Sequence, residues 1–251
     1  MKAGWRRSKW SLRKNDRIEG LGSRGAQGMG VASQMNQDEI FRPGGFDITA
    51  RLISLSGLPP GAAVLDVGCG SGATVRFLRG TYGIEAFGID SASEGDKAGF
   101  CREPHIIKGV AEEIPFDDGS LDGIICECCF SLFADPEAVL DEYRRTIKPG
   151  GALLMSDVYA KAHEPPLHCS AVHFFTKKRI LELLESKAFA AKAFEDRSDE
   201  LKAMAGQMIM ESGAGAFYGA LGASRDEIIR AECGYYLGAW VNSSLGTENL
   251  S

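Results

Sequence analysis

Short apolar runs alternate with longer stretches of helical spacing along most of this chain. The runs are bounded by glycine or polar residues and are typical of strands buried on both faces of a sheet; they lie at 62–67, 84–89, 106–110, 121–126 and 152–159. Apolar residues recur at helical spacing at 46–55, 72–79, 135–148 and 177–186. Strands that alternate with helices predict an α/β fold, with a mostly parallel sheet and helices on both of its faces.

Capping residues set the predicted ends of three of these helices. Gly80 is expected to close the second helix. Asp135 and Pro136 open the third with an N-cap side chain and a proline in the first turn. That helix is predicted to run to Lys148, and Thr176 is expected to cap the fourth.

The last part of the chain has a different pattern. Two further strands are predicted at 190–196 and 234–240, with helical segments near 200–211 and 225–233 between them. We interpret this order as an antiparallel pair that closes the sheet, with a helical insertion at about 199–233. The insertion is rich in Met, Ala and Gly. Two roles are open for it: a lid over an apolar pocket, or packing on the edge of the sheet.

Composition and charge narrow the class of protein. The 251 residues are 44% hydrophobic and 25% charged, a balance that suits one globular domain. The net charge of −6 disfavours nucleic acid as a partner, because affinity for phosphate backbones needs clustered Lys and Arg. No apolar run approaches the roughly 18 residues of a membrane span. Seven cysteines, irregularly spaced and with no secretory signal, predict free thiols and a cytoplasmic location.

The N-terminal segment differs from the rest of the chain. It contains eight Lys and Arg residues against two acidic ones, with scattered glycines and no apolar periodicity. We predict that residues 1–35 form a disordered basic arm and that 36–251 form a single domain. Two alternatives are open for the arm: sequence upstream of a start at Met29 or Met35, and a targeting or RNA-binding tail.

A glycine-rich turn follows the first predicted strand. The segment from Val64 to Gly72 reads VLDVGCGSG, and glycine suits such a turn because it accepts unusual backbone angles and lets a ligand approach closely. The segment also satisfies the dinucleotide pattern G-x-G-x-x-G/A. However, Asp66 lies just before the turn, and a carboxylate there suits a positively charged amino group better than a pyrophosphate. Asp90 ends the next strand, where it can hold ribose hydroxyls of either cofactor type.

Four blocks in the same order resemble the class I S-adenosylmethionine-dependent methyltransferases, most closely the branch with quinone-biosynthesis, sterol and arsenite methyltransferases. They read VLDVGCGSG, GIDSA, GVAEEIPFDDGSLDGIICE and IKPGGALLMSD. The resemblance implies a Rossmann-like, doubly wound, seven-stranded sheet whose last strand is antiparallel. It also implies S-adenosyl-L-methionine as cofactor and methyl transfer to a small-molecule acceptor by in-line displacement.

The same resemblance implies roles for particular positions. The cofactor-binding set is Asp66, Gly68, Cys69 and Gly70 around the methionine part, Asp90 and Ser91 at the ribose, and Ala111 and Glu112 along the adenine. Relatives often have an acidic residue at the position of Val110, which here leaves adenine recognition to backbone groups and Glu112.

Two further charged residues are candidates for cofactor contact. Arg42, in the segment FRPGG, can pair with the methionine carboxylate, because Arg matches a carboxylate bidentately. A plain Pro-Gly turn is the alternative. Glu127 ends the fourth strand, and ligands of open α/β sheets bind beyond the carboxyl ends of strands. For Glu127, contact with the cofactor and a place on the solvated rim are both open.

Three cysteines, Cys126, Cys128 and Cys129, flank that glutamate. We expect Cys126 and one neighbour to be small core residues, as free cysteines often are. A thiol or soft-metalloid role, by analogy with arsenite methyltransferases, is the alternative. No metal is predicted, because no second pair of cysteines stands at zinc-ligand spacing.

A general base is needed only if the acceptor carries a proton. The candidates are Asp157, Tyr159 and His163, in or after the fifth strand, with His168 next. Capping of the backbone is the alternative for Asp157. For His163, His168 and His173, surface or packing roles are the default, and a metal cluster with Cys169 is a further possibility.

Two other functions are compatible with these patterns. One is a nicotinamide-dependent oxidoreductase on a similar fold. The other is a protein that binds S-adenosylmethionine without catalysis.

Overall fold

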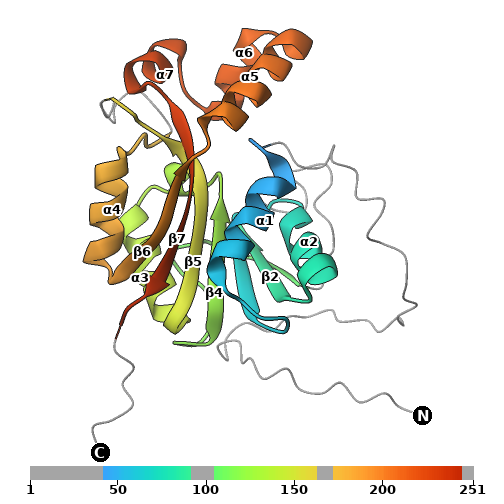
Figure 1. Cartoon of the computed structure of the whole chain (residues 1–251), viewed down its shortest axis with the longest axis vertical. Helices are drawn as coiled ribbons and strands as arrows, with labels where there is room; N and C mark the ends of the chain where they lie inside the picture. Colours follow the sequence, from blue (N-terminus) through green and yellow to red (C-terminus); the bar gives the residue numbers. More distant parts are fainter. Residues whose placement is uncertain (1–41, 92–104, 163–171, 245–251) are drawn as a thin grey trace, which may run out of the picture.

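The computed structural model describes residues 42–91, 105–162 and 172–244, which share a seven-stranded sheet in the order β3-β2-β1-β4-β5-β7-β6 (Figure 1). The strands are β1 (Ala63–Val67), β2 (Glu85–Asp90), β3 (Ile106–Lys108), β4 (Leu121–Glu127), β5 (Ile147–Tyr159), β6 (Phe189–Asp196) and β7 (Gly234–Asn242). Strand β7 is antiparallel to both β5 and β6, and the pairs among β1 to β5 are parallel. The predicted sheet with an antiparallel last strand is confirmed. The predicted arm and His163, His168 and Cys169 lie outside the described ranges.

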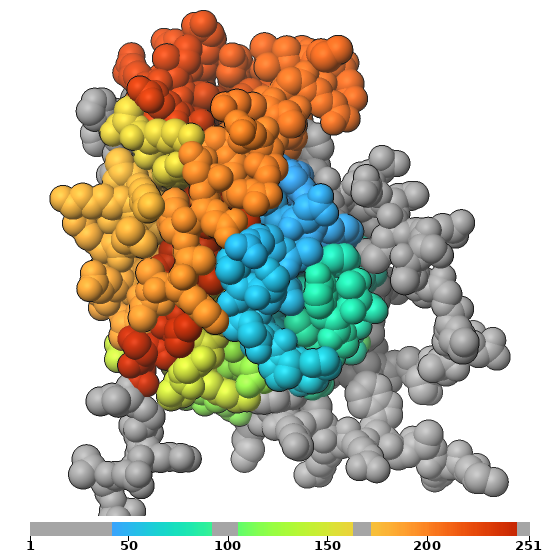
Figure 2. Space-filling model, viewed as in Figure 1, coloured from blue at the N-terminus to red at the C-terminus, as the bar shows by residue number. Residues whose placement is uncertain are grey.

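Helices cover both faces of the sheet. They are α1 (Gly45–Ser56) and α2 (Ala73–Tyr82) on one face and α3 (Pro136–Thr146) and α4 (Lys177–Ser186) on the other. Buried side chains of α1 and α2 pack with Val64 and Leu154, whereas those of α3 and α4 pack with Leu65 and Leu153. Successive strand residues therefore face opposite layers, as the pleat requires. Figure 2 shows α1, in blue, between α2, in teal, and the orange of β6 and α5.

Three helices lie between β6 and β7 in the sequence. They are α5 (Ser198–Ser212), α6 (Ala214–Leu221) and α7 (Arg225–Ala231), and they gather at the top of the view in Figure 1. Ser224 and Glu227 form a capping box that begins α7. The short helix η2 (Phe130–Leu132) follows β4. None of the helices in the described ranges has the length and apolar character of a membrane span.

Two predicted helix ends are wrong by a few residues. Helix α2 continues through Gly80 because Gly83, at φ 64°, closes it by donating its N–H to the Leu78 carbonyl. Helix α3 stops at Thr146, since Ile147 is already extended and pairs with β4.

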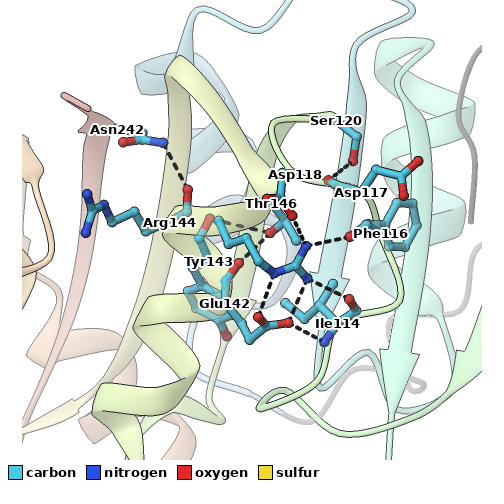
Figure 3. Close-up of polar contacts among 11 residues, drawn as sticks. Ile114, Phe116, Asp117, Asp118, Ser120, Glu142, Tyr143, Arg144, Thr146 and Asn242 are labelled. Atoms are coloured by element: carbon cyan, nitrogen blue, oxygen red, sulfur yellow. Dashed lines mark hydrogen bonds and ion pairs between the residues drawn. The ribbon is translucent and has the colours of Figure 1, made fainter. Parts of the chain in front are cut away.

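A single arginine fixes the path of the chain between β3 and β4. Arg145 of α3 donates to the carbonyl oxygens of Ile114 (2.9 Å) and Phe116 (2.8 Å). Its guanidinium also pairs with the carboxylates of Asp118 and Glu142. Glu142 in turn accepts the N–H of Ile114 at 2.8 Å. Figure 3 shows these groups converging on one cation.

Candidate active site

A crevice of about 460 Å³ opens beyond the carboxyl ends of β1, β2 and β4. Pockets that bind small molecules have volumes of roughly 300–1,000 Å³. Its lining includes five residues predicted from the sequence, which are Gly68, Asp90, Ser91, Ala111 and Glu112. The structure therefore brings together residues from three separate blocks of the sequence.

The glycine turn forms part of the floor of the crevice. Gly68 has φ +75°, and a Cβ there would come within 2.7 Å of the Cys129 Sγ. The N–H of Gly70 donates to the Asp90 Oδ2 at 2.7 Å. One carboxylate of the crevice thus also holds the turn in place.

Cys69 and Val110 differ in what they present to a ligand in the crevice. The Cys69 side chain is buried, and a Cβ on Gly88 would come within 2.6 Å of its sulfur. Only the backbone of Cys69 is therefore available to a ligand. Val110 lines the crevice and is 45% exposed, so it presents an apolar side chain there.

Arg42 and Glu127 form a buried ion pair beside the crevice. The Arg42 Nη2 lies 3.0 Å from the Glu127 Oε2, and the Glu127 side chain is 2% exposed. Thr49 donates its hydroxyl to the Glu127 carboxylate at 3.1 Å, while Arg42 donates to the Thr74 hydroxyl at 3.0 Å. The solvated rim considered for Glu127 is therefore wrong, and Arg42 is more than a residue of a Pro-Gly turn.

Asp66 is buried near that pair. Burial, reinforced by the Glu127 carboxylate and opposed by Arg42, raises the pKa of Asp66 to about 8. Burial also raises the pKa of Glu127, against the attraction of Arg42 and the hydrogen bond from Thr49. Asp66 is thus mostly protonated at neutral pH, and a cation placed beside it would favour the carboxylate.

A second cavity adjoins the crevice, and we call it the capped cavity. It measures about 100 Å³ and lies among Arg42, the end of β5, and the insertion helices α5 and α6. Its lining combines apolar Val158, Val172, Met204 and Leu221 with polar Ser131, Asp157 and Tyr235. Cys128 and Leu132 line both cavities, so the two spaces are neighbours.

Asp157 is tied into the backbone at this cavity. It accepts from the N–H of Ser131 (2.8 Å), the hydroxyl of Ser131 (2.9 Å) and the N–H of Val158 (2.7 Å). Burial raises the pKa of Asp157 to about 6, although these bonds oppose the shift. Asp157 therefore caps backbone N–H groups, as one of the two alternatives predicted. It also lines the capped cavity.

Tyr235 was not predicted as a site residue. Its hydroxyl donates to the Ser156 hydroxyl at 3.0 Å and lies 3.0 Å from the Cys128 sulfur. The antiparallel register pairs it with Val158 at the end of β5. The GYYLGAW strand was visible in the sequence, but nothing in the sequence fixed this register.

Tyr159 and His173 line neither cavity. The Tyr159 ring packs edge-on against Phe194 and Tyr236. Burial and the nearby Asp196 raise the pKa of Tyr159 to about 12, which makes its phenol a poor source of a phenolate at neutral pH. The His173 ring stacks on Phe175 with centroids 5.3 Å apart, a packing arrangement.

The cysteines after β4 occupy different environments. Cys126 is fully buried, Cys129 is 9% exposed, and Cys128 is half-buried. The expectation of small core residues is confirmed for Cys126 and Cys129. Within the described ranges, no group of three or more His, Cys, Asp or Glu side chains is placed to hold a metal ion.

Comparison with known proteins agrees with this geometry. Residues 65–155, from β1 into β5, match the family described as a methyltransferase domain. The fatty-acid O-methyltransferase of Mycolicibacterium smegmatis is 33% identical over 104 residues, which are 39% of this chain and 37% of that protein. Over the matched part, the chain is similar to class I S-adenosylmethionine-dependent methyltransferases. It spans little more than a third of the length of the first curated relatives that it matches.

Solved structures of other proteins share the fold of this chain. Haemonchus contortus phosphoethanolamine N-methyltransferase 2, solved with phosphomonomethylethanolamine and S-adenosylhomocysteine, has a TM-score of 0.64 at 16% identity over 80% of this chain and 54% of that one. The [4+2]-cyclase SpnF has a TM-score of 0.61 at 21% identity over 78% and 80%. Because a cyclase and a methyltransferase share it, the fold alone does not set the reaction.

Proposed function

We propose that this protein transfers a methyl group from S-adenosyl-L-methionine to a small-molecule acceptor. The observation that carries the proposal is the contact between two cavities at the carboxyl ends of the strands, through Cys128 and Leu132. One cavity has the size and the carboxylate of a nucleoside site. The other is smaller, mostly apolar, and capped by the insertion helices.

The residues present fit the cofactor. Asp90 and Ser91 would bind the ribose hydroxyls, Ala111 and Glu112 would lie along the adenine, and the turn from Gly68 to Gly70 would take the methionine part. Asp66 would take the ammonium group, because a cation placed beside its buried carboxyl favours the carboxylate form. Arg42 would face the methionine carboxylate and share its guanidinium with Glu127.

S-adenosyl-L-methionine supplies a methyl group already activated on a sulfonium, with a neutral thioether as leaving group. The chain then has to align the acceptor and exclude water. Val158, Val172, Met204 and Leu221 would hold the apolar body of the acceptor. Cys128 and Leu132, at the junction, would set the line of approach.

Asp157 is the candidate base for an acceptor that carries a proton. It lines the capped cavity, and with a pKa of about 6 it is mostly ionised at neutral pH. If it accepts the proton, kcat/KM rises with pH through about 6. Tyr159 is a weaker candidate because it lines neither cavity.

The test has two stages. First, calorimetry with S-adenosylhomocysteine, NAD and NADP on the full chain should show binding of the first only. Binding of NAD or NADP instead would favour the oxidoreductase. Second, transfer of labelled methyl from S-adenosylmethionine should be measured with fatty acids, hydroquinones and phosphoethanolamine as acceptors. Binding of the nucleoside without transfer to any acceptor would favour the non-catalytic alternative.

A further inference from the structure

Two thiols lie in direct contact below the crevice. The Sγ atoms of Cys126 and Cys129 are 3.2 Å apart, and neither residue forms a disulfide. Since a disulfide bond is about 2.05 Å long, the sulfurs need to approach by only about 1.2 Å to form one. This pair has no part in the methyl transfer proposed above.

Only one of the two thiols can be reached from outside. Cys126 is fully buried within β4, whereas Cys129 lines the crevice. Cys126 is also held by pairing with Val67 and Met155 on the two adjacent strands. Cys129 lies beyond the strand and follows Cys128, whose φ is +57°. A reagent that enters the crevice therefore meets Cys129 first, and Cys129 is outside the strand pairing that holds Cys126.

We propose that Cys126 and Cys129 form a reversible oxidation site for small hydroperoxides, reached through the crevice and protected when the crevice is filled. The Cys129 sulfur attacks the terminal peroxide oxygen, which gives a sulfenic acid and releases water or an alcohol. The Cys126 sulfur then attacks the Cys129 sulfur and expels water as the disulfide forms. Two thiols are oxidised and one peroxide is reduced, with no other reactant.

The environment of Cys126 and Cys129 makes their oxidation by peroxide slow. The hydrogen bond with Cys126 and burial raise the pKa of the Cys129 thiol well above its ordinary value. Because the thiolate is the reactive form, a protonated thiol reacts slowly with peroxide. The site therefore responds to sustained rather than brief oxidation.

Disulfide formation would change the floor of the crevice. The Cys129 Sγ donates to the Val67 carbonyl at 3.0 Å and lies directly against Gly68. Movement of this sulfur toward Cys126 breaks that bond and withdraws support from the glycine turn. Loss of one such contact weakens binding of S-adenosylhomocysteine roughly 2- to 10-fold. Only this consequence and the protection rest on the proposed function.

The test uses the full chain treated with hydrogen peroxide, followed by thiol blocking and peptide mass spectrometry. The expected product is a bond between Cys126 and Cys129, with loss of two hydrogens and recovery in dithiothreitol. Cys126→Ser should stop at a sulfenic acid on Cys129, which dimedone traps. Cys233→Ser, which changes a thiol away from both cavities, should leave the bond intact. Circular dichroism checks that each variant is folded.

Three results would overturn the proposal. One is oxidation of other cysteines without a bond between Cys126 and Cys129. Another is a disulfide that involves Cys128 instead. The third is an unchanged rate of oxidation when calorimetry shows that S-adenosylhomocysteine is bound. If that nucleoside does not bind at all, the proposed function fails, while mapping of the disulfide still decides the oxidation site.

Discussion

Asp66 shows how burial changes the chemistry of one residue. The residue is 4% exposed, and burial together with the nearby Glu127 carboxylate raises the pKa of its carboxyl to about 8, although Arg42 opposes the shift. Burial therefore leaves Asp66 mostly protonated at neutral pH until a cation binds. This arrangement suits recognition of an ammonium group in a small ligand.

Asp66→Asn tests that role directly. The amide cannot become negative, so the charged hydrogen bond to an ammonium group is lost. We expect the affinity for S-adenosylhomocysteine at pH 7 to fall about 10- to 100-fold, measured by calorimetry. Unchanged affinity would remove Asp66 from the cofactor site.

The same residue makes stability depend on pH. The folded-state pKa of about 8 lies above the ordinary 3.8, so the folded protein binds more protons than the unfolded chain between these values. The contribution of Asp66 is complete below about pH 4 and is lost as pH rises through about 8. We expect the free energy of unfolding to decline over this range in urea titrations. Asp66→Asn should flatten the decline, most clearly between pH 6 and 8, above the pKa of Asp157.

Gly68→Ala tests the floor of the crevice. The added Cβ would meet the Cys129 sulfur at 2.7 Å, at a φ of +75° that alanine rarely adopts. We expect a loss of about 1–3 kcal/mol in the free energy of unfolding and weaker binding of S-adenosylhomocysteine. Gly61→Ala is the matched control, because Gly61 has φ +81° but nothing within 4 Å of the added atom. Equal effects on binding in both variants would contradict the role given to Gly68.

At the scale of elements, apolar runs and caps predicted most of the architecture. Asp135 and Thr176 cap their helices as expected, each accepting a backbone N–H. The end of α2 is set by a local cap at Gly83, whereas the end of α3 is set by a contact with a distant strand. Ile147 leaves α3 because it pairs with Leu121 of β4, and no local signal in the sequence carries that information.

The connection between β3 and β4 depends on α3 through Arg145. Arg145→Ala leaves the Ile114 and Phe116 carbonyls without this donor and the Glu142 carboxylate without its cation. We expect a loss of about 1–3 kcal/mol in the free energy of unfolding. We also expect weaker nucleoside binding, because Ala111 and Glu112, which line the crevice, lie just before the segment that Arg145 holds.

Arg144→Ala is the matched control for that change. Arg144 is the adjacent residue on α3, and within the described ranges its side chain donates only to the Ser244 hydroxyl, at 3.3 Å. Thermal unfolding and calorimetry of both variants make the comparison. A similar loss of binding in both would mean that the position of the connection does not depend on Arg145.

At the scale of the whole molecule, the insertion helices close the second cavity. Met204 of α5 lines it, whereas Met210 on the same helix is 88% exposed. Met204→Trp should fill the capped cavity, raise the KM for an acceptor at least several-fold, and leave binding of S-adenosylhomocysteine unchanged. Met210→Trp should change neither quantity. Equal kinetics in the two variants would place the acceptor elsewhere.

The sequence by itself determined the strands, the glycine turn and the crevice residues around Gly68 and Asp90. These features depend on local periodicity and on short motifs at strand ends, which the parallel sheet brings to one edge. Only the tertiary structure decided that Arg42 pairs with Glu127, that Tyr235 rather than Tyr159 lines the capped cavity, and that Cys126 touches Cys129. The first two depend on register and side-chain direction between segments far apart in the chain, and the third depends on how the chain turns where β4 ends against β1. Those relations follow from packing of the whole sheet and its helices, which no local pattern encodes.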